Sequence, residues 1–311
     1  MQKNIVFITD DNYCQHAAVM LESLLQTNGA CQFVFYCLSF SLKLENKEKL
    51  STICNKGSKI LFIETKDNLG FLKKLESGAA IKQWNPIMYL KCFMHLLLPI
   101  SVERLLFLDV DMVINHDIEE LYKIDLKENI IAGVEDWKYS YLHKRRIGLE
   151  ESANYINSGV MIIDVTKWRD LEGKYRMSDF LLANKDIIIN DQDALALYFK
   201  DKIAYIDQRW NVTSYWFEKK PRILDIYLGQ LDDIRRNPYI IHFCEPIKPW
   251  FKECRHPYAY LYKKNLRLTP WSNYMYPTCG SHFGKPAWRY LVKQWLNDIG
   301  LRNDDWAMVK V

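Results

Sequence analysis

Two aspartates, Asp109 and Asp111, have the residue type and spacing that best suit chemistry in this sequence. They follow a short apolar run, Arg104–Leu108, which indicates a buried strand. Alternate residues of an extended chain point to the same side, so both carboxylates can converge on one point. Because two close carboxylates repel each other unless a cation lies between them, the pair favours a hard divalent metal. His242, which ends the strand-like run Tyr239–Ile241, is a candidate third ligand and suits manganese better than calcium.

Each candidate motif also has a plainer interpretation. The aspartate pair is equally compatible with a simple turn, and a single histidine at a strand end is more often a core residue. Asp191-Gln192-Asp193 is also a good start for an ordinary helix, because aspartate caps helices and suits their first turn. Asn157-Ser158-Gly159 resembles a turn, Tyr13 a core residue and Lys248 part of a solvated turn. A site can therefore be inferred only where several motifs agree.

The segments that must position these residues alternate between apolar runs and amphipathic stretches. This pattern is typical of strand-helix-strand units and a mainly parallel sheet, in which ligands bind at the carboxyl ends of the strands. We expect strands at Ile5–Ile8, Phe33–Leu38, Ile60–Ile63, Arg104–Leu108, Ile130–Val134, Val160–Ile163, Ile203–Ile206 and Tyr239–Phe243. We expect helices at Ala17–Leu25, Leu42–Cys54, Met88–Leu98 and Asp191–Phe199.

Composition predicts one main domain with a basic appendage. The chain has 311 residues, of which 49% are hydrophobic and 14% aromatic, enough for a sizeable core. The net charge is +4, and residues 242–311 hold 11 Lys and Arg against 5 Asp and Glu, so all the excess positive charge lies there. The composition changes near Trp250, which places a domain at residues 1–250 and an aromatic, basic extension at 251–311.

The cysteines and the hydropathy predict a reduced, cytosolic protein. None of the eight cysteines forms a CxxC pair, and several fall in apolar strand-like runs. The apolar run Ile5–Ile8 is stopped by Thr9-Asp10-Asp11 and is too short for the apolar region of a signal peptide. No run reaches the roughly 18 to 20 apolar residues that a membrane span needs. We expect a soluble or peripheral protein, in which the glycosylation sequon at Asn211–Thr213 is a chance match.

Five motifs occur in the order seen in glycosyltransferase family 8, and over about residues 4–250 the chain resembles this family. The motifs are Ile5–Tyr13, Phe107–Asp111, Asn157–Val160, Asp191–Asp193, and His242 followed by Lys248–Trp250. The chain is most similar to bacterial members that extend lipopolysaccharide or lipooligosaccharide cores. The resemblance implies an α/β fold of GT-A type: one Rossmann-like nucleotide-sugar-binding domain with a mixed, mainly parallel central sheet, and a small helical or irregular C-terminal tail.

The resemblance also implies a role for each matching residue. Asp109, Asp111 and His242 would hold Mn²⁺, with Mg²⁺ as the alternative. Asp136, Asp191 and Gln192 would be catalytic and face the transferred sugar. The residues expected to bind the donor are Thr9, Asp10, Asn12, Tyr13, Lys91, Asp109, Val110, Asn157, Ser158 and Lys248.

Two positions depart from the family pattern. Lys91 stands where the family usually has arginine, and it keeps the charge but loses the planar group that holds two oxygens at once. Glu245 stands where the family usually has a glycine between the histidine and the lysine. Both changes concern the affinity for the donor and the identity of the donor sugar. They leave open a non-catalytic nucleotide-sugar-binding protein of the same fold.

The resemblance implies transfer of galactose or glucose from UDP-galactose or UDP-glucose to a saccharide acceptor, with an α-glycoside as product. The expected acceptor is the lipopolysaccharide or lipooligosaccharide core, as an oligosaccharide or a lipid-linked saccharide, and no nucleic acid is expected. An enzyme of this kind would lie in the cytoplasm, peripherally on the inner membrane. Trp288, Leu291, Val292 and Trp295 share one helical face, which suits either an anionic membrane or docking on the domain itself. A phosphatase of the haloacid dehalogenase type is a further alternative, since it also places Asp-x-Asp after a strand.

Overall fold

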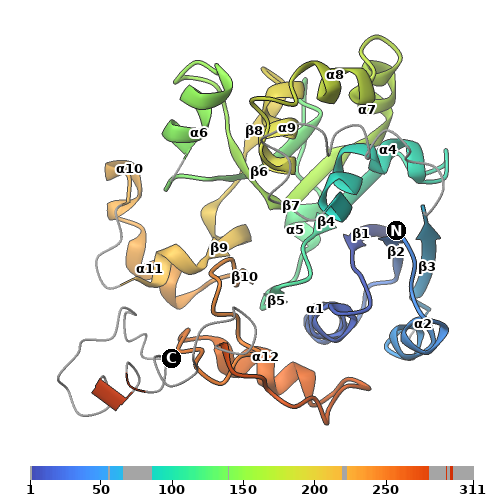
Figure 1. Ribbon diagram of the computed structural model, residues 1–311, viewed down its shortest axis with the longest axis vertical. Helices are drawn as coiled ribbons and strands as arrows, with labels where there is room; N and C mark the ends of the chain where they lie inside the picture. Colours follow the sequence, from blue (N-terminus) through green and yellow to red (C-terminus); the bar gives the residue numbers. More distant parts are fainter. Residues whose placement is uncertain are drawn as a thin grey trace.

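A computed structural model describes residues 2–54, 57–65, 86–138, 140–218 and 223–279, together with residues 292, 295 and 296. The chain begins with a parallel unit, drawn in blue in Figure 1. It consists of β1 (Lys3–Ile8), α1 (Cys14–Thr27), β2 (Phe33–Ser39), α2 (Leu44–Ser51) and β3 (Lys59–Glu64). This is the strand-helix-strand pattern predicted from the sequence.

The main sheet has seven strands in the order β3-β2-β1-β4-β7-β6-β8 within the described ranges. The later strands are β4 (Arg104–Leu108), β6 (Ile131–Glu135), β7 (Ile156–Asp164) and β8 (Ile203–Tyr205). β7 runs antiparallel to both of its neighbours, whereas the other pairings are parallel. The mixed, mainly parallel sheet expected from the resemblance is confirmed.

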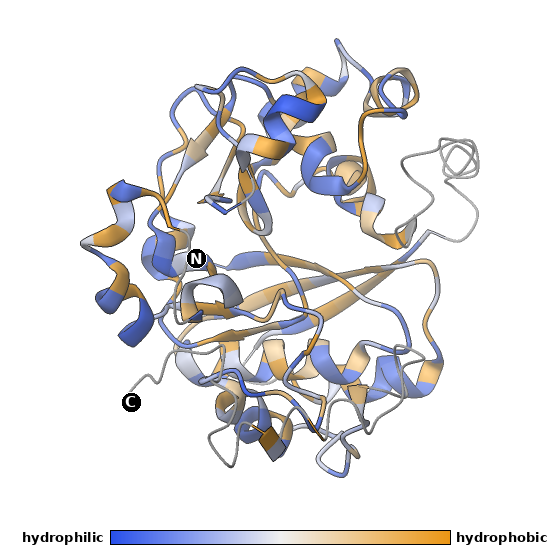
Figure 2. Ribbon diagram, turned by 60° about the vertical axis from the view of Figure 1, so that its left-hand side comes forward, coloured by the Kyte–Doolittle hydropathy of each residue, from blue (hydrophilic) through white to orange (hydrophobic). Residues whose placement is uncertain are grey.

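Helices cover both faces of this sheet, which explains why its strands are apolar without alternation. On β1, Val6 packs into one core together with α7, α8 and α9, and Ile5 and Phe7 pack into another together with α1. Figure 2 shows apolar residues concentrated in the strands that cross the middle of the molecule, with helices on either side. Further α-helices in the part of the chain that the structure describes are α4 (Met94–Leu97), α5 (Glu119–Tyr122), α6 (Ser140–Ile147), α7 (Val165–Glu172), α8 (Met177–Ala183), α9 (Asp191–Tyr198), α10 (Asp225–Leu228), α11 (Leu231–Arg236) and α12 (Ala259–Leu266).

A second, three-stranded sheet extends from the end of β4. Its strands are β5 (Met112–Ile114), β10 (Ile240–His242) and β9 (Val212–Thr213), in the order β5-β10-β9. β10 runs antiparallel to β5, with His242 opposite Met112. This register places His242 next to Asp111, although the two residues are far apart in sequence.

The segment expected to be a helix at Met88–Leu98 is mostly a 3₁₀-helix, η2 (Pro86–Phe93), followed by the short α4. Apolar spacing over so few residues does not separate the two helix types, whose periods are 3.0 and 3.6 residues. Two further 3₁₀-helices, η3 (Gln208–Asn211) and η4 (Ser214–Phe217), flank β9. Helix α4 ends at Leu97, and Leu98 has an extended backbone, because proline disfavours a helical backbone in the residue before it.

The first part of the C-terminal extension packs on α1. Tyr258, Tyr262 and Leu266 share a core cluster with Val19 of α1 and with Trp250. The helical face expected at residues 288–295 lies outside the described residues except for Val292 and Trp295, both of which are exposed. In the described part of the chain no helix is long and apolar enough to cross a membrane. All eight cysteines are free thiols.

Candidate active site

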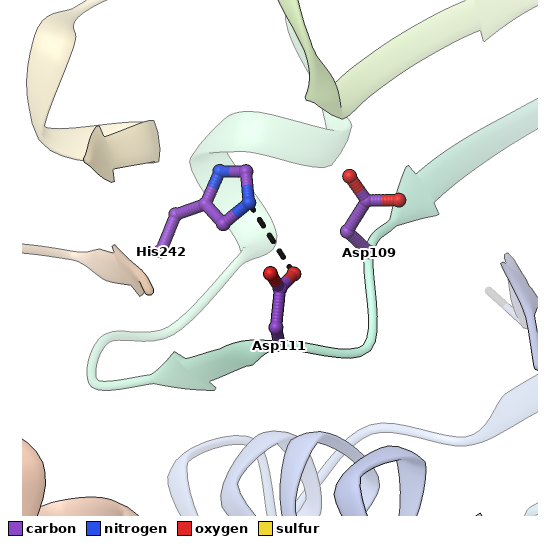
Figure 3. A group of neighbouring side chains, drawn as sticks. All are labelled: Asp109, Asp111 and His242. Atoms are coloured by element: carbon purple, nitrogen blue, oxygen red, sulfur yellow. Dashed lines mark ion pairs between the residues drawn. The ribbon is translucent and has the colours of Figure 1, made fainter. Parts of the chain in front are cut away.

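The two aspartates and the histidine singled out in the sequence meet at the junction of the two sheets (Figure 3). Asp109 follows β4, Asp111 precedes β5, and His242 ends β10. One ligand atom from each side chain lies within 4.8 Å of the other two, and His242 Nε2 is 3.3 Å from Asp111 Oδ1. Two carboxylates and an imidazole at this spacing fit a divalent ion such as Mn²⁺ or Mg²⁺.

Gly159 makes room for the histidine. A Cβ atom at this position would lie 2.6 Å from His242 Cε1 and 2.9 Å from its Nδ1. The glycine therefore permits a close approach that no other residue allows. Its carbonyl also accepts the backbone N–H of Asp109 at 2.9 Å. The turn suggested for Asn157-Ser158-Gly159 is wrong, because all three residues lie within β7.

Two lysines neutralise the two aspartates. Lys91 Nζ is 2.9 Å from Asp109 Oδ1 and 2.9 Å from Asp191 Oδ2, and Lys248 Nζ is 2.7 Å from Asp111 Oδ2. Burial alone would raise the pKa of Asp111, but Lys248 and His242 outweigh it and hold this pKa well below its usual value. Burial also acts against charge on Lys91, yet its two carboxylate partners raise its pKa. Both lysines are therefore held as cations at the site.

The three residues expected to be catalytic form one hydrogen-bonded group. Gln192 Nε2 donates to Asp136 Oδ2 at 2.8 Å, and Gln192 Oε1 accepts the backbone N–H of Ser158 at 3.1 Å. Ser158 Oγ donates to Asp191 Oδ2 at 2.9 Å. Asp191 and Gln192 also open α9, so the helix-start interpretation is correct. Lys91 joins this group through its two ion pairs to Asp109, Asp111 and His242, which form the candidate metal-ligand cluster.

Asp193, the last residue of the same motif, is a structural anchor. It is fully buried and accepts hydrogen bonds from Arg146 Nη2 at 2.7 Å and from the Tyr155 hydroxyl at 2.8 Å. Its backbone N–H is capped by Asn190 Oδ1 at 2.8 Å. These contacts fix the first turn of α9, and with it the positions of Asp191 and Gln192.

The residues expected to bind the nucleotide lie at the end of β1, which neighbours β4. Asp10 Oδ1 accepts the backbone N–H groups of Asn12 at 2.9 Å and Tyr13 at 3.1 Å, so it shapes the loop that leads into α1. Thr9 Oγ1 donates to the Asp10 carbonyl. The Tyr13 ring is 37% exposed, so part of its surface is available to a base.

Aromatic residues from the end of the domain and from α12 support this loop. The Tyr13 ring meets the rings of His16 and Trp250 edge-on, with centroids 5.2 and 5.8 Å away. His16 stacks on Trp250 at 3.6 Å, and its Nδ1 is 2.7 Å from the Tyr262 hydroxyl. The extension therefore contributes to the surroundings of Tyr13.

Sequence reasoning missed two residues that shape the site. The sequence places Gly159 in a turn and in one motif of the family but assigns it no role of its own, and it places Asn211 only in a sequon. Asn211 is fully buried, and its Oδ1 lies 3.0 Å from His242 Nδ1. Neither role has a signal in the sequence, because each depends on which strands pair. Val110, between the two aspartates, is half-buried and packs against the core on the α1 side.

Comparisons with known proteins agree with this geometry. A family model described as Glycosyl transferase family 8 matches residues 4–254. General stress protein A of Bacillus subtilis is 30% identical over 278 residues, which cover 86% of this chain and 94% of that protein. Lipopolysaccharide 1,2-glucosyltransferase of Escherichia coli K12 is 23% identical over 274 residues, which cover 87% of this chain and 79% of that protein.

Solved structures share the fold. The galactosyltransferase LgtC, in complex with donor and acceptor sugar analogues, superposes with a TM-score of 0.73 at 23% identity, covering 86% of this chain and 96% of that one. The family match spans most of the chain, and membership of this family explains both the order of the motifs and their arrangement in the fold. The chain belongs to glycosyl transferase family 8 and is a glycosyltransferase of the GT-A fold.

Proposed function

We propose that this enzyme transfers a hexose from UDP-galactose or UDP-glucose to a saccharide acceptor, with Mn²⁺ as cofactor and with retention of anomeric configuration. The observation that supports the proposal most strongly is the position of Lys91. Its ammonium group is paired with Asp109 of the metal-ligand cluster and also with Asp191, which belongs to the group of residues expected to face the sugar. Donor diphosphate and donor sugar would thus be bound side by side.

Loss of UDP from the donor leaves negative charge on the diphosphate while the anomeric carbon becomes cationic. A divalent ion on Asp109, Asp111 and His242 would neutralise that charge, so no general acid is required. Lys248, already beside Asp111, adds a point charge at the same end of the site. The acidic ligands and the two lysines thus form a site suited to a nucleoside diphosphate.

We propose that the acceptor attacks from the same face that UDP leaves. The bond from the acceptor oxygen to the anomeric carbon forms as the bond to the phosphate oxygen breaks, and the hydroxyl proton passes to that phosphate oxygen. Double displacement would need a carboxylate nucleophile at the anomeric carbon. Asp191 is buried and already accepts from Lys91 and Ser158, and Gln192 is an amide, a poor nucleophile. Mass spectrometry that traps a sugar covalently bound to Asp136 or Asp191 would overturn same-face attack.

A donor screen tests the proposed reaction. The purified enzyme is mixed with one UDP-sugar at a time, with and without Mn²⁺, and UDP release is measured. We expect Mn²⁺-dependent release with UDP-galactose or UDP-glucose, abolished by Asp111→Asn and unchanged by Asp170→Asn, an exposed aspartate on α7. Donor binding without release from any UDP-sugar would instead favour the non-catalytic alternative, and release of inorganic phosphate from an added phosphate monoester would favour the phosphatase.

We propose the lipopolysaccharide or lipooligosaccharide core as the acceptor. Among the relatives are lipopolysaccharide 1,2-glucosyltransferase of Escherichia coli and lipopolysaccharide 1,3-galactosyltransferase of Salmonella typhimurium, at 23% and 21% identity. Incubation with truncated core oligosaccharides should give a product heavier by one hexose. Turnover of other saccharides but of no core oligosaccharide would rule out this acceptor while leaving the donor reaction intact.

We further propose that the enzyme works at the cytoplasmic face of the inner membrane, with the basic end of the chain against anionic lipid. Because Tyr258, Tyr262 and Leu266 pack on α1, only the residues after Cys279 should be removed in a test. Flotation with vesicles containing anionic lipid should recover the full chain and less of the variant that ends at Cys279. Equal recovery would exclude this segment as the contact.

A further inference from the structure

The two ring nitrogens of His242 have different partners. Nε2 faces Asp111 Oδ1 at 3.3 Å, on the side of the metal-ligand cluster. Nδ1 lies 3.0 Å from Asn211 Oδ1, inside the protein. A neutral imidazole carries its proton on only one nitrogen, and a ligating nitrogen must present its lone pair. Ligation through Nε2 therefore requires the proton on Nδ1.

A short chain of hydrogen bonds, which starts at a backbone amide, determines where that proton lies. The backbone N–H of Gly159 donates to Asn157 Oδ1 at 3.1 Å, which identifies this atom as the oxygen of the Asn157 amide. Asn211 Nδ2 donates to the same oxygen at 2.8 Å. The remaining oxygen of Asn211 must then face His242 Nδ1, and an oxygen there accepts a hydrogen bond and cannot donate one.

We infer that Asn211 is a positioning residue that holds His242 in the Nδ1–H tautomer, with the Nε2 lone pair directed at the metal. Partners of this kind commonly fix the orientation and tautomer of ligating histidines. The inference deepens the proposed function, because it rests on the metal site proposed above. The same chain holds the oxygen of Asn157, so that the Asn157 NH₂ group is the part left to donate to the sugar.

The backbone around Asn211 makes the arrangement rigid. Asn211 ends η3 and directly precedes β9, where Val212 pairs with Ile241 of β10. Asn211 is 0% exposed and His242 only 5% exposed, so water does not compete for the bond. Asn211 therefore lies directly before β9 and His242 lies on the adjacent strand β10, so the pairing of these two strands sets their separation.

The tautomer can be measured directly, without metal or substrate. In protein labelled with ¹⁵N-histidine, the ring nitrogens of His242 are assigned by comparison with His242→Gln and recorded at about pH 8, where an ordinary imidazole is neutral. Wild-type His242 should carry its proton on Nδ1. Asn211→Leu, close in size but without an acceptor, should lose this preference, and Mn²⁺ affinity, followed by the free Mn²⁺ signal in electron paramagnetic resonance, should fall about 10- to 100-fold.

Two further variants separate positioning from a general loss of a buried amide. Asn211→Asp keeps an acceptor for Nδ1–H but removes the donor to Asn157, so the tautomer should be retained and Mn²⁺ affinity should exceed that of Asn211→Leu. Asn265→Leu removes a mostly buried amide from α12, where it donates to the Leu261 carbonyl, and should change neither readout. Circular dichroism confirms that each variant is folded.

The outcomes distinguish this inference from the proposed function. An Nδ1 without a proton in the wild type, an unchanged Nδ1 proton in Asn211→Leu, or unchanged Mn²⁺ affinity after that proton is lost would each overturn the role of Asn211. The Nδ1–H tautomer in a wild-type protein that binds no Mn²⁺ would leave the hydrogen-bond chain standing and refute the proposed metal site.

Discussion

Replacing Gly159 with alanine should disable the metal site while the fold persists. The new Cβ would lie 2.6 Å from His242 Cε1 and 2.7 Å from Met112 Cε, both closer than real Cβ atoms approach. Ordinary van der Waals contact begins at about 3.4 Å, so the imidazole must retreat by about 0.8 Å if the backbone stays in place. The backbone of β7 is held by pairing with β4 and β6, and the side chain is therefore the part that moves.

A displacement of this size matters because metal-ligand distances tolerate only about 0.2 Å. The move also breaks the hydrogen bond between His242 Nδ1 and Asn211, which is 3.0 Å long. We expect Mn²⁺ affinity to fall at least about 10- to 100-fold and the rate of UDP release to fall about 100-fold. Overpacking should also cost about 1–3 kcal/mol of the free energy of unfolding.

The matched control is Gly133→Ala on the neighbouring strand β6. Its Cβ would lie 2.8 Å from the Ile156 Cδ1 methyl group, so the steric conflict is similar but meets no metal ligand. Urea unfolding should show comparable losses of stability in both variants, whereas Mn²⁺ titration should show weak binding only in Gly159→Ala. If Gly159→Ala binds Mn²⁺ within about threefold of the wild type, the argument that this glycine makes room for a ligating histidine is refuted.

Three further predictions follow from buried charged or titratable groups. Lys91→Met should lower kcat/KM for UDP release about 100-fold or more, because Asp109 and Asp191 lose their shared cation, whereas Lys91→Arg should stay within about tenfold of wild type. Asp193→Asn should lose about 2–3 kcal/mol in urea unfolding, yet the folded fraction should still bind Mn²⁺. Burial lowers the pKa of His16 to about 3, whereas an ordinary histidine, as in the unfolded chain, has a pKa of about 6.5. The neutral buried ring therefore contributes fully to stability above about pH 6.5. This contribution is lost as the pH falls towards 3, by up to about 1.4 kcal/mol per pH unit. His16→Gln should flatten this slope, measured by urea unfolding at several pH values, and an unchanged slope would exclude His16 as its source.

The strands of the main sheet could be predicted because each is a short apolar run bounded by polar or turn residues. β4 is the clearest case, since it was expected at Arg104–Leu108 and has these bounds. Its position also placed Asp109 at the carboxyl end of a central strand, where ligands bind. Local pattern alone therefore located Asp109 and Asp111, two of the three candidate metal ligands.

The pairing of strands could not be predicted in the same way, and it decides the rest of the site. His242 lies beside Asp111 only if β10 runs antiparallel to β5 in the observed register, and nothing local to either segment specifies that partner. A register shifted by one residue would turn the histidine to the other face of the sheet. The position of Gly159 depends on the pairing of β7 with β4, and that of Asn211 on the pairing of β9 with β10, so neither role follows from the residue's own sequence neighbourhood.

The first part of the C-terminal extension packs against the main domain, although the composition places a domain boundary near Trp250. The change near Trp250 is real in the sequence, and the family match also ends nearby, at residue 254. Yet Trp250 stacks on His16, and the Tyr262 hydroxyl reaches the same ring from α12. His16 in turn meets Tyr13 edge-on. Trp250 and Tyr262 therefore pack, directly or through His16, against Tyr13, the residue that we expect to stack on the base of the donor.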